Sequence, residues 1–304
     1  MTMMTTTTMT TTTSGTAVAD LLLHRRLATG ALCSVYEAHA AAIDRRVAFK
    51  RMHREHLADP GLVGRCLNEA LMLQALQHHT DLPGLPQLFA HGLLPDGCPY
   101  MVLELLGESL GQRLERRCKQ DALAPDQRVR QIVRLGAQVG STLAGLHAHG
   151  IIHRDLRPDN ILFAGAPERA YVIDLGLAKA RLMRGLQLMP ISTGDEDFIG
   201  TAEYMSPEQW RAPKRVTGAT DVYALGVVLF LLSQGALPFV AEKQSALMYQ
   251  HCFSAPPALP EYLPAGVAEL IQQCLEKSPT QRPPAAAVAA RLSAVLAALP
   301  PTDE

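Results

Sequence analysis

The chain has 304 residues, of which 48% are apolar and 19% charged, a composition that allows one large globular domain or two moderate ones. Its 28 Lys and Arg residues nearly balance 29 Asp and Glu residues, giving a formal net charge of −1. Because no bulk basic field would attract nucleic acid or an anionic membrane, we expect no nucleic-acid partner.

The cysteine pattern and the apolar runs indicate a cytoplasmic protein. The six cysteines lie in no CxxC or other metal-ligand spacing, which favours thiols in a reducing compartment. The longest apolar run, residues 222–232, is too short to span a bilayer and is typical of a buried helix, so we expect no membrane segment. Residues 1–17, rich in threonine and without Lys or Arg, do not resemble a signal peptide and are expected to form a disordered tail.

The first part of the chain is predicted to be mostly sheet. Short β-type runs occupy residues 21–27, 34–40, 45–52, 85–94 and 98–106, and the turn signal LPDG joins the last two. One helical stretch, residues 62–76, interrupts them, and its apolar face includes a carboxylate, Glu69.

After Gly107 the pattern changes to helix. Residues 127–150 have helical periodicity and end on Gly150, a residue suited to a C-terminal cap, and further helices are expected at 220–234, 265–276 and 284–298. The sequence therefore predicts a tail (1–17), a small sheet-rich lobe (18–106) and a larger helical lobe (107–300).

Residues 150–179, GIIHRDLRPDNILFAGAPERAYVIDLGLAK, carry the most chemical information. Two short β-type runs, 161–163 and 171–173, flank a turn-rich stretch and should pair as an antiparallel hairpin. The hairpin would bring Asn160 and Asp174 to the same end, where their oxygen atoms would suit a hard cation such as Mg²⁺. Asp155 lies in the loop that leads to this end, as a base aimed at an incoming hydroxyl would.

The spacing HRDxxxxN followed by DxG resembles that of eukaryotic-type protein kinases, and the resemblance extends from about residue 20 to residue 298. It implies an α+β, two-lobed fold: a small antiparallel-sheet lobe with one helix and a larger, mainly helical lobe, with ATP in the cleft between them. Lys50 in VAFK matches the family lysine that holds the α- and β-phosphates, and Glu69 matches the helix carboxylate that pairs with it.

The same resemblance implies the adenine pocket. Leu103 is similar to the residue at the back of the pocket, and Glu104 to Leu106 are similar to the hinge whose backbone binds adenine. Leu162 would form the floor, and Leu27 and Val35 would cover the ring. Ala48 shares a strand face with Lys50, and Gly30 would lie over the phosphates.

Other matches imply structural or regulatory roles. Glu208 should pair with Arg282, Asp221 should brace the catalytic loop, and His153 should anchor that loop. Arg154 resembles the arginine that binds a phosphorylated activation segment, so autophosphorylation at Ser192 or Thr193 is expected to raise activity.

Two departures from the family pattern bear on catalysis. The glycine-rich loop has Ala28, Gly30 and Cys33 where the family has three glycines, so two positions of close backbone approach carry side chains. Arg157 stands where a lysine is expected two residues after the catalytic aspartate, which keeps the charge and changes its geometry. We interpret the loop as a stiffened lid. The HREH stretch at 53–56 is expected to lie in a solvent-facing loop rather than to bind a metal.

The sequence contains the predicted base (Asp155), the phosphate-binding pair and the metal ligands. It therefore favours an active protein kinase that phosphorylates Ser/Thr hydroxyls of protein substrates. Catalysis would rest on Asp155, Arg157 and Asn160, with Mg²⁺, or Mn²⁺ in its place, on Asn160 and Asp174. Pro158 and Thr201 resemble the Ser/Thr branch, and GTAEYMSPEQ is similar to bacterial members. The alternatives are a pseudokinase scaffold, which Ala28 and Cys33 would suit, and a small-molecule kinase, which would lack the GT and SPE features at 200–208. The pattern says nothing about oligomeric state.

Overall fold

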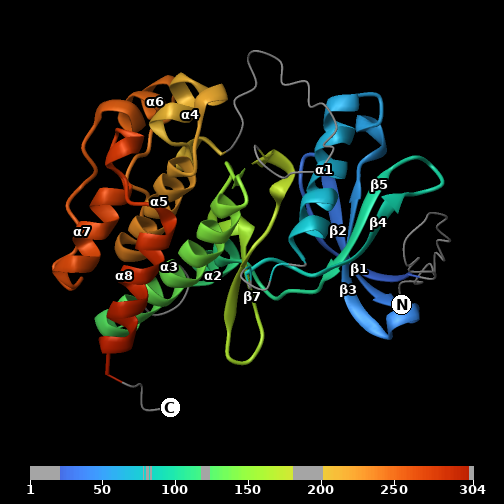
Figure 1. Cartoon of the computed structure of the whole chain (residues 1–304), viewed down its shortest axis with the longest axis horizontal. Helices are drawn as coiled ribbons and strands as arrows, with labels where there is room; N and C mark the ends of the chain where they lie inside the picture. The colour runs from blue at the N-terminus through green and yellow to red at the C-terminus, as the bar shows by residue number, and fades with distance from the viewer. Residues whose placement is uncertain are drawn as a thin grey trace. The chain divides into compact units, whose positions relative to one another are not determined.

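The computed structural model describes residues 21–77, 79, 82, 84–117, 124–180 and 201–300, which divide into two compact units (Figure 1). Of these residues, the N-terminal unit contains 21–77, 79 and 86–107, and the C-terminal unit contains 82, 84–85, 108–117, 124–180 and 201–300. The predicted tail, 1–17, lies outside the described residues.

The N-terminal unit is built on a five-stranded sheet in the order β1-β2-β3-β5-β4, and every neighbouring pair is antiparallel. The strands are β1 (Leu21–Thr29), β2 (Cys33–Ala40), β3 (Arg45–Met52), β4 (Leu88–Leu93) and β5 (Pro99–Glu104). This confirms the predicted antiparallel lobe, with strand ends shifted by a few residues.

Strand alternation gives the sheet two different faces. Val47 and Phe49 of β3 and Tyr100 and Val102 of β5 belong to one apolar cluster and are almost fully buried. The intervening residues of β3, Ala48 and Lys50, therefore point to the opposite face.

A single long helix, α1 (Pro60–Leu76), packs against β4 and β5 (Figure 1). It begins two residues before the predicted start because the Asp59 carboxylate accepts hydrogen bonds from the N–H groups of Gly61 (2.8 Å) and Leu62 (3.2 Å). Pro60 occupies the first turn, where no N–H donor is needed.

The C-terminal unit is organised around α3 (Pro125–Ala148), which packs against α8 (Ala285–Ala298) and α5 (Ala219–Gln234) (Figure 1). Gly136 allows the close packing of these helices, because a Cβ there would lie 2.4 Å from Cδ1 of Leu292. Beyond the α3 C-cap, His149, Gly150 has a φ of 73°, which confirms the predicted glycine at the helix end.

Smaller elements complete this unit. The helices are α2 (Leu110–Arg117), α4 (Pro207–Arg211), α6 (Gln244–Phe253) and α7 (Ala265–Cys274), and the short strands pair as β6 (Ile151–Ile152) with β9 (Lys179–Ala180) and β7 (Ile161–Ala164) with β8 (Arg169–Val172). The β7–β8 pairing confirms the predicted hairpin. The sequence did not predict α2, α4 or α6. With 8 and 5 residues, α2 and α4 are too short for a clear periodic pattern.

The apolar run at 222–232 lies inside α5, whose 16 residues are almost all buried. Across the described part of the chain, every helix falls short of the length and apolar character that a bilayer crossing requires.

Candidate active site

The N-terminal unit contains the predicted phosphate-binding pair. The Nζ atom of Lys50 donates to both carboxylate oxygens of Glu69, each at 2.8 Å, and the two side chains are 14% and 4% exposed. Glu69 lies on the buried face of α1 and Lys50 on the face of β3 that turns toward it. The pairing gives a physical reason for a carboxylate in an apolar stripe, because a buried charge without a partner would be costly.

Strand register places the predicted nucleotide-binding residues of the sheet on one face. Val35 lies opposite Lys50, and Ala48 lies opposite Leu103, so the side chains of all four share the face that carries Lys50. Leu27 differs, because the β1–β2 register shifts between Arg26 and Ala28 and leaves Leu27 at an irregularity.

The predicted hinge follows β5. The Glu104 N–H donates to the Gln87 carbonyl at 2.8 Å, and the Glu104 carboxylate accepts from the Gln87 N–H at 3.2 Å, which fixes the end of the strand. Leu106 follows without regular secondary structure. Leu162, the predicted pocket floor, is half-buried in β7 of the other unit.

The loop at Gly30 connects β1 to β2. The Gly30 N–H donates to the Cys33 carbonyl at 2.9 Å, and a Cβ on Gly30 would meet nothing closer than that oxygen, at 3.6 Å. The local backbone therefore does not itself require glycine at this position.

The prediction that the HREH stretch faces solvent is wrong for its histidines. His53 and His56 are half-buried against the Gly30 loop: His56 Nε2 lies 2.9 Å from the Ala31 carbonyl, and the His53 N–H donates to the Leu32 carbonyl at 2.9 Å. His53 Nε2 also lies 2.8 Å from Ser34 Oγ. The turn at 53–56 therefore supports the Gly30 loop, a role that its polar composition does not predict.

In the C-terminal unit, the β7–β8 hairpin brings Asn160 and Asp174 to the same end. Ile173, which directly precedes Asp174, donates its N–H to the Asn160 carbonyl at 3.0 Å. Asp174 has a left-handed backbone, with a φ of 70°, and its carboxylate accepts from the Gly176 N–H at 3.4 Å. Amide and carboxylate oxygens are the donor atoms that Mg²⁺ prefers, so these residues fit a hard divalent cation.

Hydrogen bonds orient the Asp155 carboxylate from two sides. The Asn160 amide donates to Asp155 Oδ2 at 3.1 Å and to the Asp155 carbonyl at 2.8 Å. Asp155 Oδ1 accepts from the Thr201 N–H at 3.1 Å and from the Thr201 hydroxyl at 3.3 Å. These hydrogen bonds fix the orientation of the carboxylate.

Arg157 completes this cluster. Its Nη1 donates to the Thr201 hydroxyl at 2.9 Å, and its guanidinium also bonds the Asp159 carboxylate. Partial burial alone would lower the pKa of Arg157, but the Asp159 carboxylate outweighs it and raises that pKa. Arg157 therefore remains a cation beside Asp155.

The pKa of Asp155 is raised above its ordinary value of 3.8. Burial is the largest cause because it disfavours the charged carboxylate; His153 opposes the shift and the negative charge of Asp174 adds to it. A raised pKa makes this carboxylate a stronger base.

Asp221 braces the loop ahead of Asp155, as predicted. Its fully buried carboxylate accepts from the backbone N–H groups of His153 (2.9 Å) and Arg154 (2.8 Å), and His147 Nε2 lies 2.7 Å from Oδ2. These bonds fix a turn in which Arg154 has a φ of 70°, a conformation that costs a non-glycine residue about 1–3 kcal/mol. His153 also anchors the loop, with Nε2 2.9 Å from the Ile173 carbonyl.

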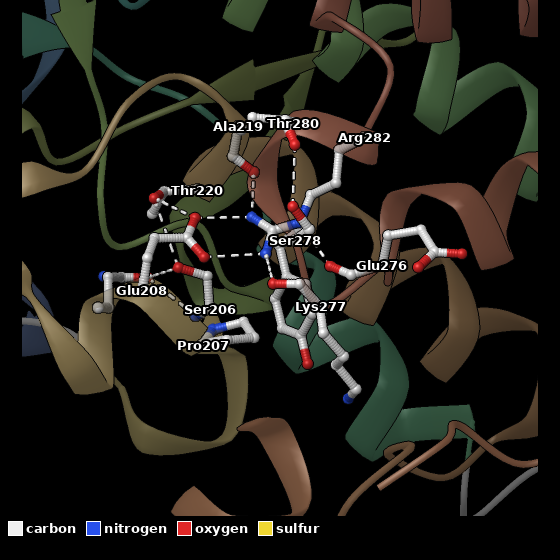
Figure 2. A network of polar contacts seen from close by, with 12 residues as sticks. Ser206, Pro207, Glu208, Ala219, Thr220, Glu276, Lys277, Ser278, Thr280 and Arg282 are labelled. Atoms are coloured by element: carbon white, nitrogen blue, oxygen red, sulfur yellow. Dashed lines mark hydrogen bonds and ion pairs between the residues drawn. The ribbon is translucent and has the colours of Figure 1, made fainter. Parts of the chain in front are cut away.

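The predicted pair of Glu208 and Arg282 is present in a dense polar network (Figure 2). Arg282 Nη1 and Nη2 donate to the two Glu208 oxygens at 2.6 and 2.8 Å, and Nη1 also donates to the Ala219 carbonyl at 2.9 Å. The Thr220 hydroxyl donates to Glu208 at 2.8 Å. Ser192 and Thr193, the predicted phosphorylation sites, lie outside the described residues.

Two residues of this site were missed at the sequence level. The sequence predicts neither the direct contact of Thr201 with Asp155 nor the contact of His147 with Asp221. The signal available for Thr201 was its position just ahead of the SPE stretch.

Comparison with known proteins agrees with this geometry. The protein kinase domain family matches residues 22–291. Serine/threonine-protein kinase PknA of Mycobacterium tuberculosis is 34% identical over 265 residues, which cover 86% of this chain and 57% of the relative. Serine/threonine-protein kinase pkn3 of Myxococcus xanthus and PksC of Streptomyces coelicolor are each 31% identical, over 88% and 91% of this chain and 48% and 49% of their own length.

The chain thus spans about half the length of the curated relatives that it matches. The matched range takes in both units and includes Lys50, Glu69, Asp155, Asn160 and Asp174. Because the family match covers most of the chain, the chain belongs to the protein kinase family and is similar to its bacterial serine/threonine members.

Proposed function

We propose that this chain is a protein kinase that transfers the γ-phosphoryl group of ATP to Ser and Thr hydroxyls of protein substrates. The observation that carries the proposal is the Asp155 carboxylate, held on one oxygen by Asn160 and on the other by Thr201. A carboxylate fixed in this way can orient an incoming hydroxyl and accept its proton. The relatives named above, all described as serine/threonine-protein kinases, support Ser/Thr rather than Tyr as the acceptor.

In this proposal residues 18–106 and 107–300 are the two lobes of the kinase, and the N-terminal one holds the nucleotide. Lys50, fixed by Glu69, would bind the phosphates, and the sheet face shared by Val35, Ala48 and Leu103 would contact adenine. Leu27, Gly30, Glu104 and Leu106 would complete the contacts of this lobe, and Leu162 would contribute from the other.

Asn160 and Asp174 would hold Mg²⁺, or Mn²⁺, through their side-chain oxygens. The bound cation would neutralise negative charge on the phosphates. Arg157 would add a positive charge beside Asp155, as a planar donor in place of the usual lysine. The scattered cysteine spacing supports a cytoplasmic location.

We also propose that autophosphorylation at Ser192 or Thr193 activates the kinase, with Arg154 binding the phosphate. Arg154 directly precedes Asp155 and is fixed at its backbone by Asp221 and Gln209, so a charge that engaged it would act close to the base. Mass spectrometry of protein incubated with MgATP should find phosphate between Leu177 and Thr201. A segment without phosphate would contradict this regulation.

The test of the proposed function is transfer of radiolabel from γ-labelled ATP to a generic basic protein by the wild type beside Lys50→Ala. We expect labelling that depends on a divalent cation and on Lys50, with the label on phosphoserine or phosphothreonine. If no labelling depends on Lys50 with any divalent cation, the pseudokinase alternative holds instead. Asp174→Ala then separates the two roles in a biological assay, since a scaffold would keep its effect in that variant and a kinase would lose it.

A further inference from the structure

Two thiols, one next to the Gly30 loop and one on α1, lie close together. The Sγ atoms of Cys33 and Cys66 lie 3.5 Å apart, within the N-terminal unit. Cys33 is the first residue of β2 and directly follows the Gly30 loop, which connects β1 to β2. Cys66 lies on the buried face of α1, three residues before Glu69, and therefore about one turn from the carboxylate that binds Lys50.

The two thiols differ in access. Cys33 is half-buried, whereas Cys66 is 5% exposed. The Cys33 thiol and burial both raise the pKa of Cys66, so Cys66 is protonated at neutral pH. An oxidant would meet Cys33 first, and Cys66 is placed to react with the product. This arrangement of an accessible thiol beside a second thiol is typical of redox-sensitive pairs.

The remaining cysteines in the described part of the chain are placed differently. Cys98, Cys252 and Cys274 are buried, and burial raises the pKa of each of them. Among these three described cysteines, the Cys98 sulfur accepts from Arg51 at 3.7 Å and the Cys252 thiol donates to the Pro207 carbonyl at 3.9 Å, and neither bond involves another sulfur. Only the Cys33 and Cys66 pair, among the described cysteines, is within reach of a bond.

We propose that Cys33 and Cys66 form a reversible disulfide when the protein meets hydrogen peroxide, and that this bond ties the Gly30 loop to the helix that carries Glu69. Peroxide is the two-electron oxidant, and the bond requires the sulfurs to approach from 3.5 Å to about 2.05 Å.

The reaction balances in two steps. In the first, the Cys33 thiolate attacks one peroxide oxygen, the O–O bond breaks, and the departing hydroxide takes up a proton to leave Cys33 as a sulfenic acid and one water. In the second, the Cys66 thiol loses its proton and attacks the Cys33 sulfur, the S–O bond breaks, and a second water leaves. Two thiols have then lost two electrons and one peroxide has become two waters. A dithiol reductant reverses the change.

The consequence for activity rests on the proposed kinase function. The loop is already held at its C-terminal side, since His56 bonds Ala31 and His53 bonds Leu32. A covalent link from Cys33 to α1 would fix this side to the helix as well. A loop that must open to release ADP would open more slowly, so the oxidised protein should have a lower kcat. Because the thiols are adjacent while Lys50 and Glu69 are paired, the link should preserve that pair.

The disulfide is tested without reference to catalysis. Trypsin releases Cys33 in the peptide 27–45 and Cys66 in 66–113, which also contains Cys98. The Cys98→Ala variant removes this ambiguity, because Cys66 is then the single thiol of its peptide. After peroxide treatment we expect the two peptides to be linked, the link to disappear on reduction, and Cys66→Ala to give instead a Cys33 sulfenic acid that dimedone traps. If 27–45 and 66–113 remain unlinked in Cys98→Ala while peroxide is consumed, the proposal is wrong.

The effect on turnover is tested by comparing each protein with itself before and after peroxide. We expect kcat to fall severalfold in the wild type and in Cys98→Ala, to recover on reduction, and not to change in Cys66→Ala. An equal loss in Cys66→Ala, or no loss in a fully linked wild type, would overturn the switch. If the reduced wild type transfers no phosphate, the kinase proposal fails, while the peptide map still decides whether the disulfide forms.

Discussion

Replacing Arg282 by methionine should destabilise the C-terminal unit more than an ordinary core substitution. The Arg282 side chain is fully buried, and the Glu208 side chain is 13% exposed. Arg282 donates to both Glu208 oxygens, to the Ala219 carbonyl, and to the carbonyls of Glu276 (2.7 Å) and Lys277 (3.2 Å) (Figure 2). Methionine fills much of the volume and supplies none of these donors.

The magnitude follows from the carboxylate that is left behind. Breaking a buried ion pair by removing one partner costs about 3–5 kcal/mol, because the remaining charge is desolvated without compensation. In Arg282→Met the Thr220 hydroxyl would still donate to Glu208, but both guanidinium hydrogen bonds to the carboxylate would be lost. With a urea m-value of about 2 kcal/mol per molar, a loss of 4 kcal/mol would lower the unfolding midpoint by about 2 M.

The chain contains one tryptophan, Trp210, and it lies in α4 beside Glu208. Its fluorescence therefore reports on the unfolding of the C-terminal unit. The Glu208→Gln/Arg282→Met double variant serves as the matched control, because it removes the charge that Arg282→Met leaves buried. We expect the double variant to be more stable than Arg282→Met alone.

The pH dependence adds an independent check. Burial by itself would raise the pKa of Glu208, but the hydrogen bonds from Arg282 hold it below its ordinary value of 4.5. Since the folded-state pKa is depressed, this stabilisation is complete above about pH 4.5 and is lost as the pH falls through the folded-state pKa.

In the urea experiment, a double variant less stable than Arg282→Met, or a midpoint shift under about 0.5 M, would refute the reasoning.

Three further predictions concern catalysis. Thr201→Val removes the hydroxyl between Asp155 and Arg157. Because a hydrogen bond to a charged group contributes about 1.5–3 kcal/mol, kcat should fall about 10- to 100-fold with the KM for ATP unchanged. Recovery of kcat in Thr201→Ser, measured by steady-state kinetics, would support this prediction, and a wild-type kcat in Thr201→Val would contradict it. The raised pKa of Asp155 means that kcat should decline as the pH falls through a value above 3.8, and a pH–rate profile flat down to pH 3.8 would exclude Asp155 as the base. Ala28→Gly combined with Cys33→Gly should lower the KM for ATP in reduced protein if the loop is a stiffened lid, whereas an unchanged KM would show that these side chains do not matter.

Much of the candidate site could be predicted because it depends on local spacing. The β7–β8 hairpin follows from two short β-type runs around a turn, and it fixes where Asn160 and Asp174 lie. Helical periodicity put Glu69 on the buried face of its helix, and strand alternation put Lys50 on the facing side of the sheet.

The contacts that were missed join residues far apart in the chain. Thr201 is 46 positions from Asp155, His147 is 74 from Asp221, and Cys33 is 33 from Cys66. No periodic pattern links such residues, because their contact depends on how several elements pack. The sequence also does not predict the short helices α2 and α4, because they contain too few turns to show a periodic pattern.

The central claim, that Asp155 is the catalytic base of an ATP-dependent protein kinase, is tested most directly by Asp155→Asn. Phosphate transfer to a protein substrate and ATP affinity, by calorimetry, should be measured on the same preparation. The account predicts that kcat falls by about 10²–10⁴-fold, since a general base is removed, while ATP affinity is unchanged. Transfer at the wild-type rate in Asp155→Asn would contradict it.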